Sequence, residues 1–338
     1  MPRAVKFSRY GGPEVLEIVQ VPRPTPGPGE VLVRVVVAPV NPGEAGIRQG
    51  VFADIWPASF PEGQGNDFAG WVAALGEGVV GFAVGDEVIG YLPRAAQADY
   101  VVSPANLLAA KPTEVSWEMA APLSAVGVTA WAAVNAVDVG ATDTVVVSAA
   151  AGGVGSLAAQ LARLRGATVI GTAGPHNADF LRSLGVVPVQ HGPGLVDRLR
   201  AAAPGGIDAF IDTFGQGNVA AAIALGVAPA RVNTIADGRA VARYGVHSQA
   251  QEDAFSPRLV AELATLVAEK RLTVPISAVY PLEQVQDAYR QVQQRHTRGK
   301  IVLSLVPEED RAALAARLRA DAAPSTASGG SEPVLGSG

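Results

Sequence analysis

Short β-branched runs alternate with stretches of helical periodicity through the middle of the chain. The runs that predict strands are Val145–Val147, Ala167–Thr172, Val186–Val189, Ile207–Ile211 and Arg231–Ile235. The stretches that predict helices between them are Leu157–Leu164, Asn177–Leu184 and Leu195–Ala203. Strands that alternate with helices in this way predict an α/β fold with a Rossmann-type, doubly wound parallel sheet.

The first part of the chain, from Arg3 to about Pro112, has the pattern of an all-β domain. Its strand-like runs, separated by glycine and proline, are Val15–Val19, Val31–Val37, Phe68–Leu75, Glu87–Tyr91 and Ala98–Val102. They predict a compact antiparallel barrel. Between Trp117 and Ala136 the pattern is helical, and Pro122 and Gly127 predict two short helices rather than one.

The last part of the chain returns to a mixed pattern. Ala236–Phe255 is polar and has no regular period, which predicts an irregular lid over a substrate, with a disordered connection as the alternative. The segments expected beyond it are a helix at Pro257–Lys270, an extended segment at Val274–Tyr280, a helix at Leu282–Gln293, a strand at Lys300–Val306, an amphipathic helix at Glu308–Ala322 and a disordered tail at Ala323–Gly338.

Small residues fill the turn between the first strand of the parallel sheet and its helix. Against the dinucleotide fingerprint G-x-G-x-x-G, this turn offers Ala150, Gly152 and Gly155. Phosphates reach the backbone N–H groups of a helix N-terminus only where side chains are absent. A turn that needs glycine only for close packing is the alternative, and the surrounding strand and helix pattern favours a pyrophosphate site.

The end of the second strand indicates which coenzyme binds. Thr172–His176 contains no carboxylate, whereas an NAD site usually places an acidic residue there to hold the ribose hydroxyls. His176, Arg182 and His191 are the nearest groups that could face a 2'-phosphate, so the sequence favours NADP(H). Thr213 and Phe214 follow the fourth strand and are candidates for the wall of the coenzyme site.

Composition narrows the class of protein. The chain has 338 residues, 49% of them hydrophobic, which is enough for two domains, and its net charge of −5 argues against a nucleic-acid partner. No apolar run has the length of a membrane span, and the N-terminus lacks a signal-peptide pattern. We therefore expect a cytoplasmic protein without a membrane partner.

Cysteine is absent, and the four histidines are not spaced as metal ligands. This composition predicts no disulfide, no thiolate nucleophile and no metal site.

Five motifs resemble those of one enzyme family, and the resemblance runs from Arg3 to about Leu305. The motifs are Val40–Pro42 (VNP), Gly65–Gly70 (GNDFAG), Val84–Val88 (VGDEV), Ala150–Gly155 (AAGGVG) and Arg298–Leu303 (RGKIVL). The chain resembles the zinc-independent branch of the medium-chain dehydrogenase/reductase superfamily, which holds quinone oxidoreductases and NADPH-dependent enone reductases. The resemblance implies a GroES-like catalytic domain at residues 1–122, completed by 273–305. It places a Rossmann NADP-binding domain at 123–272, and a helix and tail at 306–338.

The resemblance also implies roles for single residues. Asn41 and Thr129 would contact the nicotinamide half, Gly174 and His191 the adenosine ribose, and Gly299 and Lys300 would lie beside the coenzyme. The pyrophosphate would lie on Ala151, Gly152, Gly153, Val154 and Gly155, with Thr172 and His176 nearby. In zinc-dependent relatives a cysteine takes the place of Asn41 and a histidine that of Asn66. The lysine and the aromatic residue that many quinone oxidoreductases carry after the second strand and after the asparagine are absent here.

These observations lead to a hypothesis for the chemistry. NADPH would transfer hydride to a quinone or an α,β-unsaturated carbonyl, with no metal to stabilise the developing oxyanion. Asn41 is the first candidate donor to that oxygen and Tyr91 the second, with solvent supplying the final proton. Glu44 is either a proton relay or a solvated carboxylate. The alternatives are a non-redox cyclase or isomerase, or an NADPH-binding module, on the same fold. The family pattern suggests a homodimer.

Overall fold

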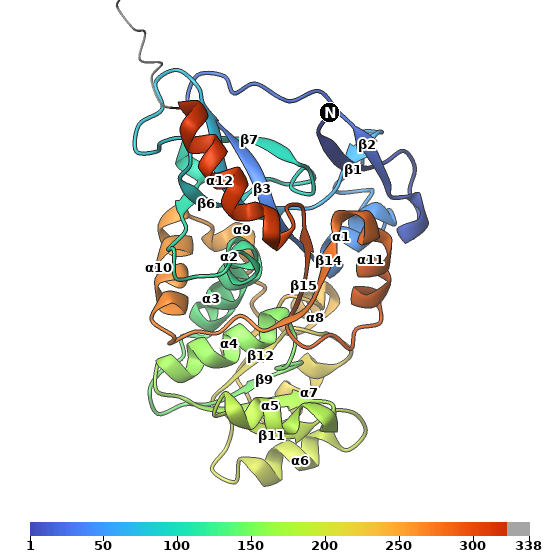
Figure 1. Cartoon of the computed structure of the whole chain (residues 1–338). Helices are drawn as coiled ribbons and strands as arrows, with labels where there is room; N and C mark the ends of the chain where they lie inside the picture. The colour runs from blue at the N-terminus through green and yellow to red at the C-terminus, as the bar shows by residue number, and fades with distance from the viewer. Residues whose placement is uncertain (323–338) are drawn as a thin grey trace, which may run out of the picture.

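A computed structural model describes residues 1–322 of the chain, and Figure 1 shows its two halves. The lower half in that view holds a five-stranded sheet in the order β11-β10-β9-β12-β13, with every neighbouring pair parallel. The strands are β9 (Thr144–Val147), β10 (Thr168–Ala173), β11 (Val187–Gln190), β12 (Ala209–Asp212) and β13 (Val232–Thr234). The connecting helices are α4 (Gly153–Leu164), α5 (Ala178–Ser183), α6 (Leu195–Ala202) and α7 (Asn218–Ala224). The predicted doubly wound sheet is confirmed.

The other half is built on a seven-stranded sheet with the order β14-β15-β3-β5-β6-β8, in which β7 also pairs with β3. Its strands are β3 (Glu30–Val40), β5 (Asp67–Leu75), β6 (Glu87–Tyr91), β7 (Tyr100–Pro104), β8 (Ala109–Ala110), β14 (Ile276–Pro281) and β15 (Lys300–Ser304). A smaller sheet contains β1 (Arg3–Phe7), β2 (Glu17–Gln20) and β4 (Glu62–Gly63). Because β15 pairs antiparallel with β3, the chain returns to its first domain after completing the parallel sheet.

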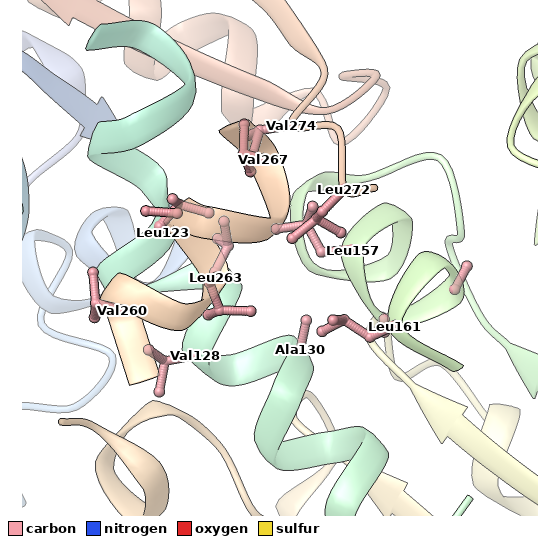
Figure 2. Close-up of a cluster of buried hydrophobic side chains, with 14 of the residues drawn as sticks. Leu123, Val128, Ala130, Leu157, Leu161, Val260, Leu263, Val267, Leu272 and Val274 are labelled. Carbon is pink, nitrogen blue, oxygen red and sulfur yellow. The ribbon is translucent and has the colours of Figure 1, made fainter. Parts of the chain in front are cut away.

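A cluster of buried side chains joins α4 to two further helices, α3 (Val126–Ala136) and α10 (Pro257–Ala268). Figure 2 labels Leu123, Val128, Ala130, Leu157, Leu161, Val260, Leu263, Val267, Leu272 and Val274, which come together between these helices. The burial of these apolar side chains fixes the position of α4 relative to the half that contains the seven-stranded sheet, which we call the GroES-like half.

Residues 117–136 form two helical segments, as predicted. The first comprises α2 (Trp117–Ala120) and the 3-10 helix Ala121–Ser124, and it meets α3 at a bend of 49°. In the described residues no single helix is long and apolar enough to cross a membrane. The two segments of this bent pair, taken together, have the length and the apolar composition of a membrane span.

The prediction of an irregular segment at Ala236–Phe255 is wrong. This segment contains α8 (Gly238–Tyr244) and α9 (Gln251–Ala254). Asp237 caps α8 by accepting a hydrogen bond from the Ala240 N–H at 3.0 Å, and Gly245 ends the helix with a positive φ. The strand expected at Val15–Val19 also differs, because Pro13–Val15 forms a 3-10 turn and β2 begins only at Glu17.

The remaining helices pack around the GroES-like half. They are α1 (Pro42–Arg48), α11 (Val285–Gln293) and α12 (Glu308–Ala322). Among residues 308–320 of α12, Leu314, Ala315 and Leu318 are the ones that pack against the core, so the apolar face of this part is narrower than the sequence predicts. Arg311 of α12 forms an ion pair with Glu118 at 2.8 Å. The predicted disorder of Ala323–Gly338 lies outside the described residues.

Candidate active site

The glycine-rich turn lies at the carboxyl end of β9, where α4 begins. Gly152 is the residue before α4, and no side chain accepts a hydrogen bond from the first turn of the helix. A Cβ added to Gly152 would meet only the Ala149 carbonyl oxygen, at 3.2 Å, whereas a Cβ on Gly155 would overlap the backbone of Ala149 and Ala150. Gly152 thus leaves the helix N-terminus open to an anion, and Gly155 serves close packing.

A second segment of chain lies against this turn. The Gly299 N–H donates to the Ala151 carbonyl oxygen at 2.8 Å, and Gly299 and Gly152 form a parallel bridge. Gly299 has a φ of 71°, a conformation that glycine adopts without strain. Gly153 makes room for the next side chain, because its Cβ would lie 2.8 Å from Cδ of Lys300. The structure therefore brings the predicted residues Ala151–Gly155, Gly299 and Lys300 together.

The Lys300 side chain extends from this turn to Asn41. The Lys300 Nζ donates to Oδ1 of Asn41 at 2.6 Å and to the Val40 carbonyl oxygen at 2.8 Å. On the other side of the amide, Nδ2 of Asn41 donates to Asp67 Oδ1 at 2.7 Å and to Glu44 Oε1 at 2.8 Å. An ammonium on one side and two carboxylates on the other fix the orientation of the amide. Both amide hydrogens of Asn41 are engaged.

Glu44 lies beneath Asn41, 3% exposed, and is not a solvated loop carboxylate. It accepts hydrogen bonds from the Asn41 N–H at 3.0 Å, the Asn66 N–H at 3.1 Å and the Tyr289 hydroxyl at 2.6 Å, besides the Asn41 amide. Burial raises the pKa of Glu44, while these donors oppose the shift. With all these donors in place, Glu44 anchors Asn41 and α1 rather than facing a cleft.

Tyr289 connects this cluster to the interior of the GroES-like half. Its hydroxyl accepts hydrogen bonds from Nε2 of Gln64 at 2.6 Å and of Gln97 at 3.0 Å, and the buried Arg48 guanidinium lies 4.7 Å from its ring centroid. Burial and the neighbouring Glu44 carboxylate raise the pKa of Tyr289 well above its ordinary value.

Asp67, the first residue of β5, is the second buried acid of the site. It is fully buried, and within residues 1–322 its Oδ1 has a hydrogen-bond partner whereas its Oδ2 has none. Burial raises the pKa of Asp67 to about 7, the nearby Lys300 lowers it and Glu44 raises it. Lys300 is 4% exposed, and burial lowers its pKa against the opposing effect of Asp67 and Glu44.

The loop after β12 is organised by the buried carboxylate of Asp212. Five groups donate to it: Ser148 Oγ, Thr234 Oγ1, Asn218 Nδ2 and the N–H groups of Phe214 and Gly215. Thr213 is held by Ser148, the residue that donates to Asp212, because the Thr213 hydroxyl donates to the Ser148 carbonyl oxygen at 2.7 Å. Thr213 and Phe214 are therefore held at the carboxyl edge of the sheet, beside the glycine-rich turn.

The segment after β10 holds the residues predicted for the adenosine end. The Thr172 carbonyl oxygen accepts from the Ala150 N–H at 3.0 Å, and Gly174 and the exposed His176 follow directly. Arg298 reaches this segment, donating to Asn177 Oδ1 at 2.9 Å and to the His176 carbonyl oxygen at 3.2 Å. The exposed guanidinium of Arg298 thus stands beside the predicted His176, while the predicted Arg182 donates to Asp179 at 2.6 Å.

Three predicted residues are less closely connected to the cluster. The Thr129 hydroxyl donates to the Ala125 carbonyl oxygen of its own helix at 2.8 Å. His191 follows β11 and is exposed. Tyr91 pairs in register with Asp67, its ring centroid lies 5.6 Å from that of Phe255, and burial raises its pKa.

Sequence reasoning did not name Asp67, Tyr289, Arg298 or Asp212 as site residues. Asp67 lies in the motif Gly65–Gly70 and Arg298 in the motif Arg298–Leu303, so both could have been predicted as site residues from these motifs. Tyr289 lies 245 residues from Glu44 in the chain, and only the fold brings the two together. In residues 1–322, no group of three or more His, Asp or Glu side chains is placed to hold a metal ion.

Comparisons with known proteins agree with this architecture. Residues 27–113 match the alcohol dehydrogenase GroES-like domain family, and residues 186–303 match the zinc-binding dehydrogenase family. The chain is 31% identical over 324 residues to the chloroplastic quinone-oxidoreductase homologue of Spinacia oleracea, covering 89% of this chain and 97% of that one.

Two solved structures are similar over 90% of this chain and the whole of their own. An NAD-dependent alcohol dehydrogenase has 30% identity and a TM-score of 0.78. A mycobacterial protein solved in complex with NADPH has 27% identity and a TM-score of 0.78.

A GroES-like domain joined to a dinucleotide-binding sheet defines a medium-chain dehydrogenase/reductase. The chain belongs to the quinone oxidoreductase branch of that superfamily, as the sequence predicts, and is an NAD(P)-dependent oxidoreductase. The cytoplasmic location stays a prediction, since the spinach relative is chloroplastic.

Proposed function

We propose that the protein is an NADPH-dependent, metal-free reductase of quinones or α,β-unsaturated carbonyls. One observation carries the proposal: the Lys300 side chain connects the open turn before α4 to Asn41, so the coenzyme turn and the polar cluster form one site. A bound coenzyme would supply hydride to an electron-poor carbon of the substrate.

The residues present fit a dinucleotide. The N-terminus of the 12-residue helix α4 carries no capping side chain, and Gly152 leaves space in front of it. Thr213 and Phe214 would flank the coenzyme on the side of β12.

The preference for NADPH is supported by charge. No carboxylate follows β10 before Asp179, and Arg298 and His176 lie at that edge. A 2'-phosphate would meet positive charge there and no repulsion.

The experiment follows the absorbance of NADPH and NADH with the purified full-length protein. The substrates are para-benzoquinone, menadione and cyclohexenone, and a second sample is first dialysed against a chelator. We expect oxidation of NADPH, a kcat/KM at least about 10-fold lower with NADH, and no loss after chelation. A preference for NADH would overturn the coenzyme assignment. Coenzyme binding without oxidation would overturn the reductase and favour a non-redox enzyme or a binding module.

A further inference from the structure

In residues 1–322, the buried ammonium of Lys300 makes no direct ion pair with a carboxylate, and its hydrogen bonds go to the neutral oxygens of Val40 and Asn41. Its side chain is 4% exposed, and in the part of the chain that the structure describes no acidic oxygen lies within 4.0 Å of its Nζ. Buried charges are usually paired, because burial without a counter-charge is costly. The other buried lysine, Lys111, follows that rule with Glu87 at 2.6 Å. Lys300 therefore has an incomplete environment of the kind found at functional sites.

Its position is fixed by backbone geometry. The Lys300 N–H donates to the Pro275 carbonyl oxygen at 2.8 Å, and the aliphatic part of the side chain lies across Gly153. The ammonium is thus carried past the turn of α4 to the end of β3, where it meets Val40 and Asn41. An ammonium has three hydrogens, and two of them are used, which leaves one N–H.

Asn41 is poorly suited to bind a substrate oxygen by itself. Its two amide hydrogens are held by Asp67 and Glu44, at 2.7 and 2.8 Å. Donation to a substrate would break one of these bonds and leave a buried carboxylate oxygen unpaired. The third N–H of Lys300 is therefore a donor in direct contact with Asn41 that needs no existing hydrogen bond to break, whereas Tyr91 reaches Asn41 only through its strand partner Asp67.

We propose that Lys300 is the group that binds the oxygen of the substrate and transfers a proton to it. This inference rests on the reductase proposed above. Hydride from the coenzyme forms a C–H bond at the electron-poor carbon, and the π-electron pair moves onto the oxygen. An N–H bond of Lys300 then breaks and an O–H bond forms, leaving a neutral amine that regains its proton from solvent.

The charged groups around Lys300 suit this step. Asp67 on β5 and Glu44 on α1 act electrostatically on the ammonium. Tyr91 on β6 pairs in register with Asp67, and Tyr289 on α11 donates to Glu44. Burial lowers the pKa of Lys300, which makes its ammonium a better acid, and Asp67 and Glu44 act in the opposite direction.

The first test needs no turnover. The probe is para-nitrophenol, whose absorbance reports its ionisation, titrated into the protein with saturating NADP⁺. We expect wild type to bind the phenolate at least about 10-fold more tightly than the neutral phenol. Lys300→Met should abolish this preference, Lys300→Arg should retain it, and the matched control Lys270→Met, at an exposed lysine, should leave it unchanged.

The second test measures kcat and NADP⁺ affinity. Lys300→Met and Lys300→Arg should each lower kcat about 100-fold or more, because arginine keeps the charge and does not release a proton. The NADP⁺ dissociation constant should change less than about 3-fold in both.

The outcomes separate the two proposals. A phenolate preference that survives Lys300→Met overturns the inference. So does a wild type without such a preference. A loss of NADP⁺ affinity in Lys300→Met, with phenolate binding unchanged, would assign Lys300 to the coenzyme phosphates. A lysine-dependent phenolate preference without NADPH oxidation would overturn the reductase and leave the oxyanion site standing.

Discussion

At Asn41, a single side-chain amide connects Lys300 to Asp67 and Glu44. The amide lies between one ammonium and two carboxylates, so the charges on its two sides determine which way it points. Charge-assisted hydrogen bonds of 2.6 to 2.8 Å are strong enough to keep the cluster rigid. Asn41 is therefore the centre of a buried hydrogen-bond network.

We predict that Tyr289→Phe destabilises the protein by about 2–4 kcal/mol. The hydroxyl donates to Glu44 and accepts from Gln64 and Gln97, all of them buried, and phenylalanine would leave these groups short of a partner. The measurement is the free energy of unfolding in urea.

Tyr280→Phe is the matched control. The Tyr280 hydroxyl donates to Gln291 at 2.6 Å, but the pair is only partly buried, so its loss should cost about 1 kcal/mol or less. Equal losses in the two variants would contradict the view that the Tyr289 network is the costlier one to break.

Asp67→Asn should change how stability depends on pH. The pKa of Asp67 is raised to about 7 in the folded protein and is near 3.9 in an unfolded chain. Between these values the folded state binds more protons, so the contribution of Asp67 to stability is complete below about pH 4 and is lost as the pH rises through about 7. Lys300, Glu44 and Tyr91 surround it.

Relative to Asp67→Asn, wild type should therefore lose about 2–4 kcal/mol of unfolding free energy between about pH 4 and pH 8. Urea unfolding at both values measures the difference. Because the two proteins share their other acids, parallel pH dependences would show that Asp67 does not carry the shifted proton.

The sequence predicted Asn41, Glu44 and Lys300 as site residues, but not what joins them. Glu44 was expected either as a relay or as a solvated carboxylate, and it is buried because Tyr289 of α11 closes over it. Motifs identify residues close in the chain, whereas the partners of a buried carboxylate come from the fold.

At the level of elements, the turn before α4 shows that neighbouring glycines have different roles. We predict that Gly155→Ala destabilises the protein by about 2–3 kcal/mol, since a Cβ there would overlap the backbone of Ala149. Gly152→Ala should cost less than about 1 kcal/mol and weaken NADP⁺ binding at least about 10-fold, because its Cβ would enter the space before the helix. Urea unfolding and calorimetric titration separate the two effects.

Wild-type coenzyme affinity in Gly152→Ala would show that the phosphates do not approach at this residue. Gly43→Ala serves as the control, because nothing lies within 4 Å of a Cβ at that exposed position.

The elements of the parallel sheet were predicted well, and the segment beyond it was not. Repeated strand and helix patterns define β9 to β13, because buried parallel strands need continuous apolar runs. Ala236–Phe255 lacks such runs, yet α8 forms there between the Asp237 cap and Gly245. Asp237 and Gly245 could have predicted the two ends of α8 from the sequence. The helix was missed because the segment has no long run of apolar residues at helical spacing.

At the level of the whole molecule, the order of the chain determines how the site is assembled. Asn41 follows strand β3 of the first half, α4 belongs to the half with the parallel sheet, and Lys300 begins β15, where the chain returns to the first half. Local sequence patterns predict each part. Their meeting depends on β15 pairing with β3, which the family resemblance implied and periodicity alone does not.

The predicted homodimer depends on which sheet edge is free. His247 lies parallel to β13, donating to the Val232 carbonyl oxygen and accepting from the Thr234 N–H, each at 2.9 Å. The edge of β13 is thereby covered by the chain itself. Since backbone groups of successive residues in an extended segment point to opposite sides, Ser248 directs its N–H and carbonyl groups outward.

We predict that a second copy pairs with this outer edge and that Ser248→Pro yields a monomer, because proline removes the outward N–H donor. Light scattering during gel filtration should give twice the chain mass for wild type and the single chain mass for the variant. Ser248→Ala keeps the N–H and should remain dimeric. A dimer that survives Ser248→Pro would place the interface elsewhere, and a monomeric wild type would end the dimer hypothesis. Since Ser248 is exposed, coenzyme binding measured on the Ser248→Pro monomer would also tell whether each chain carries a complete site.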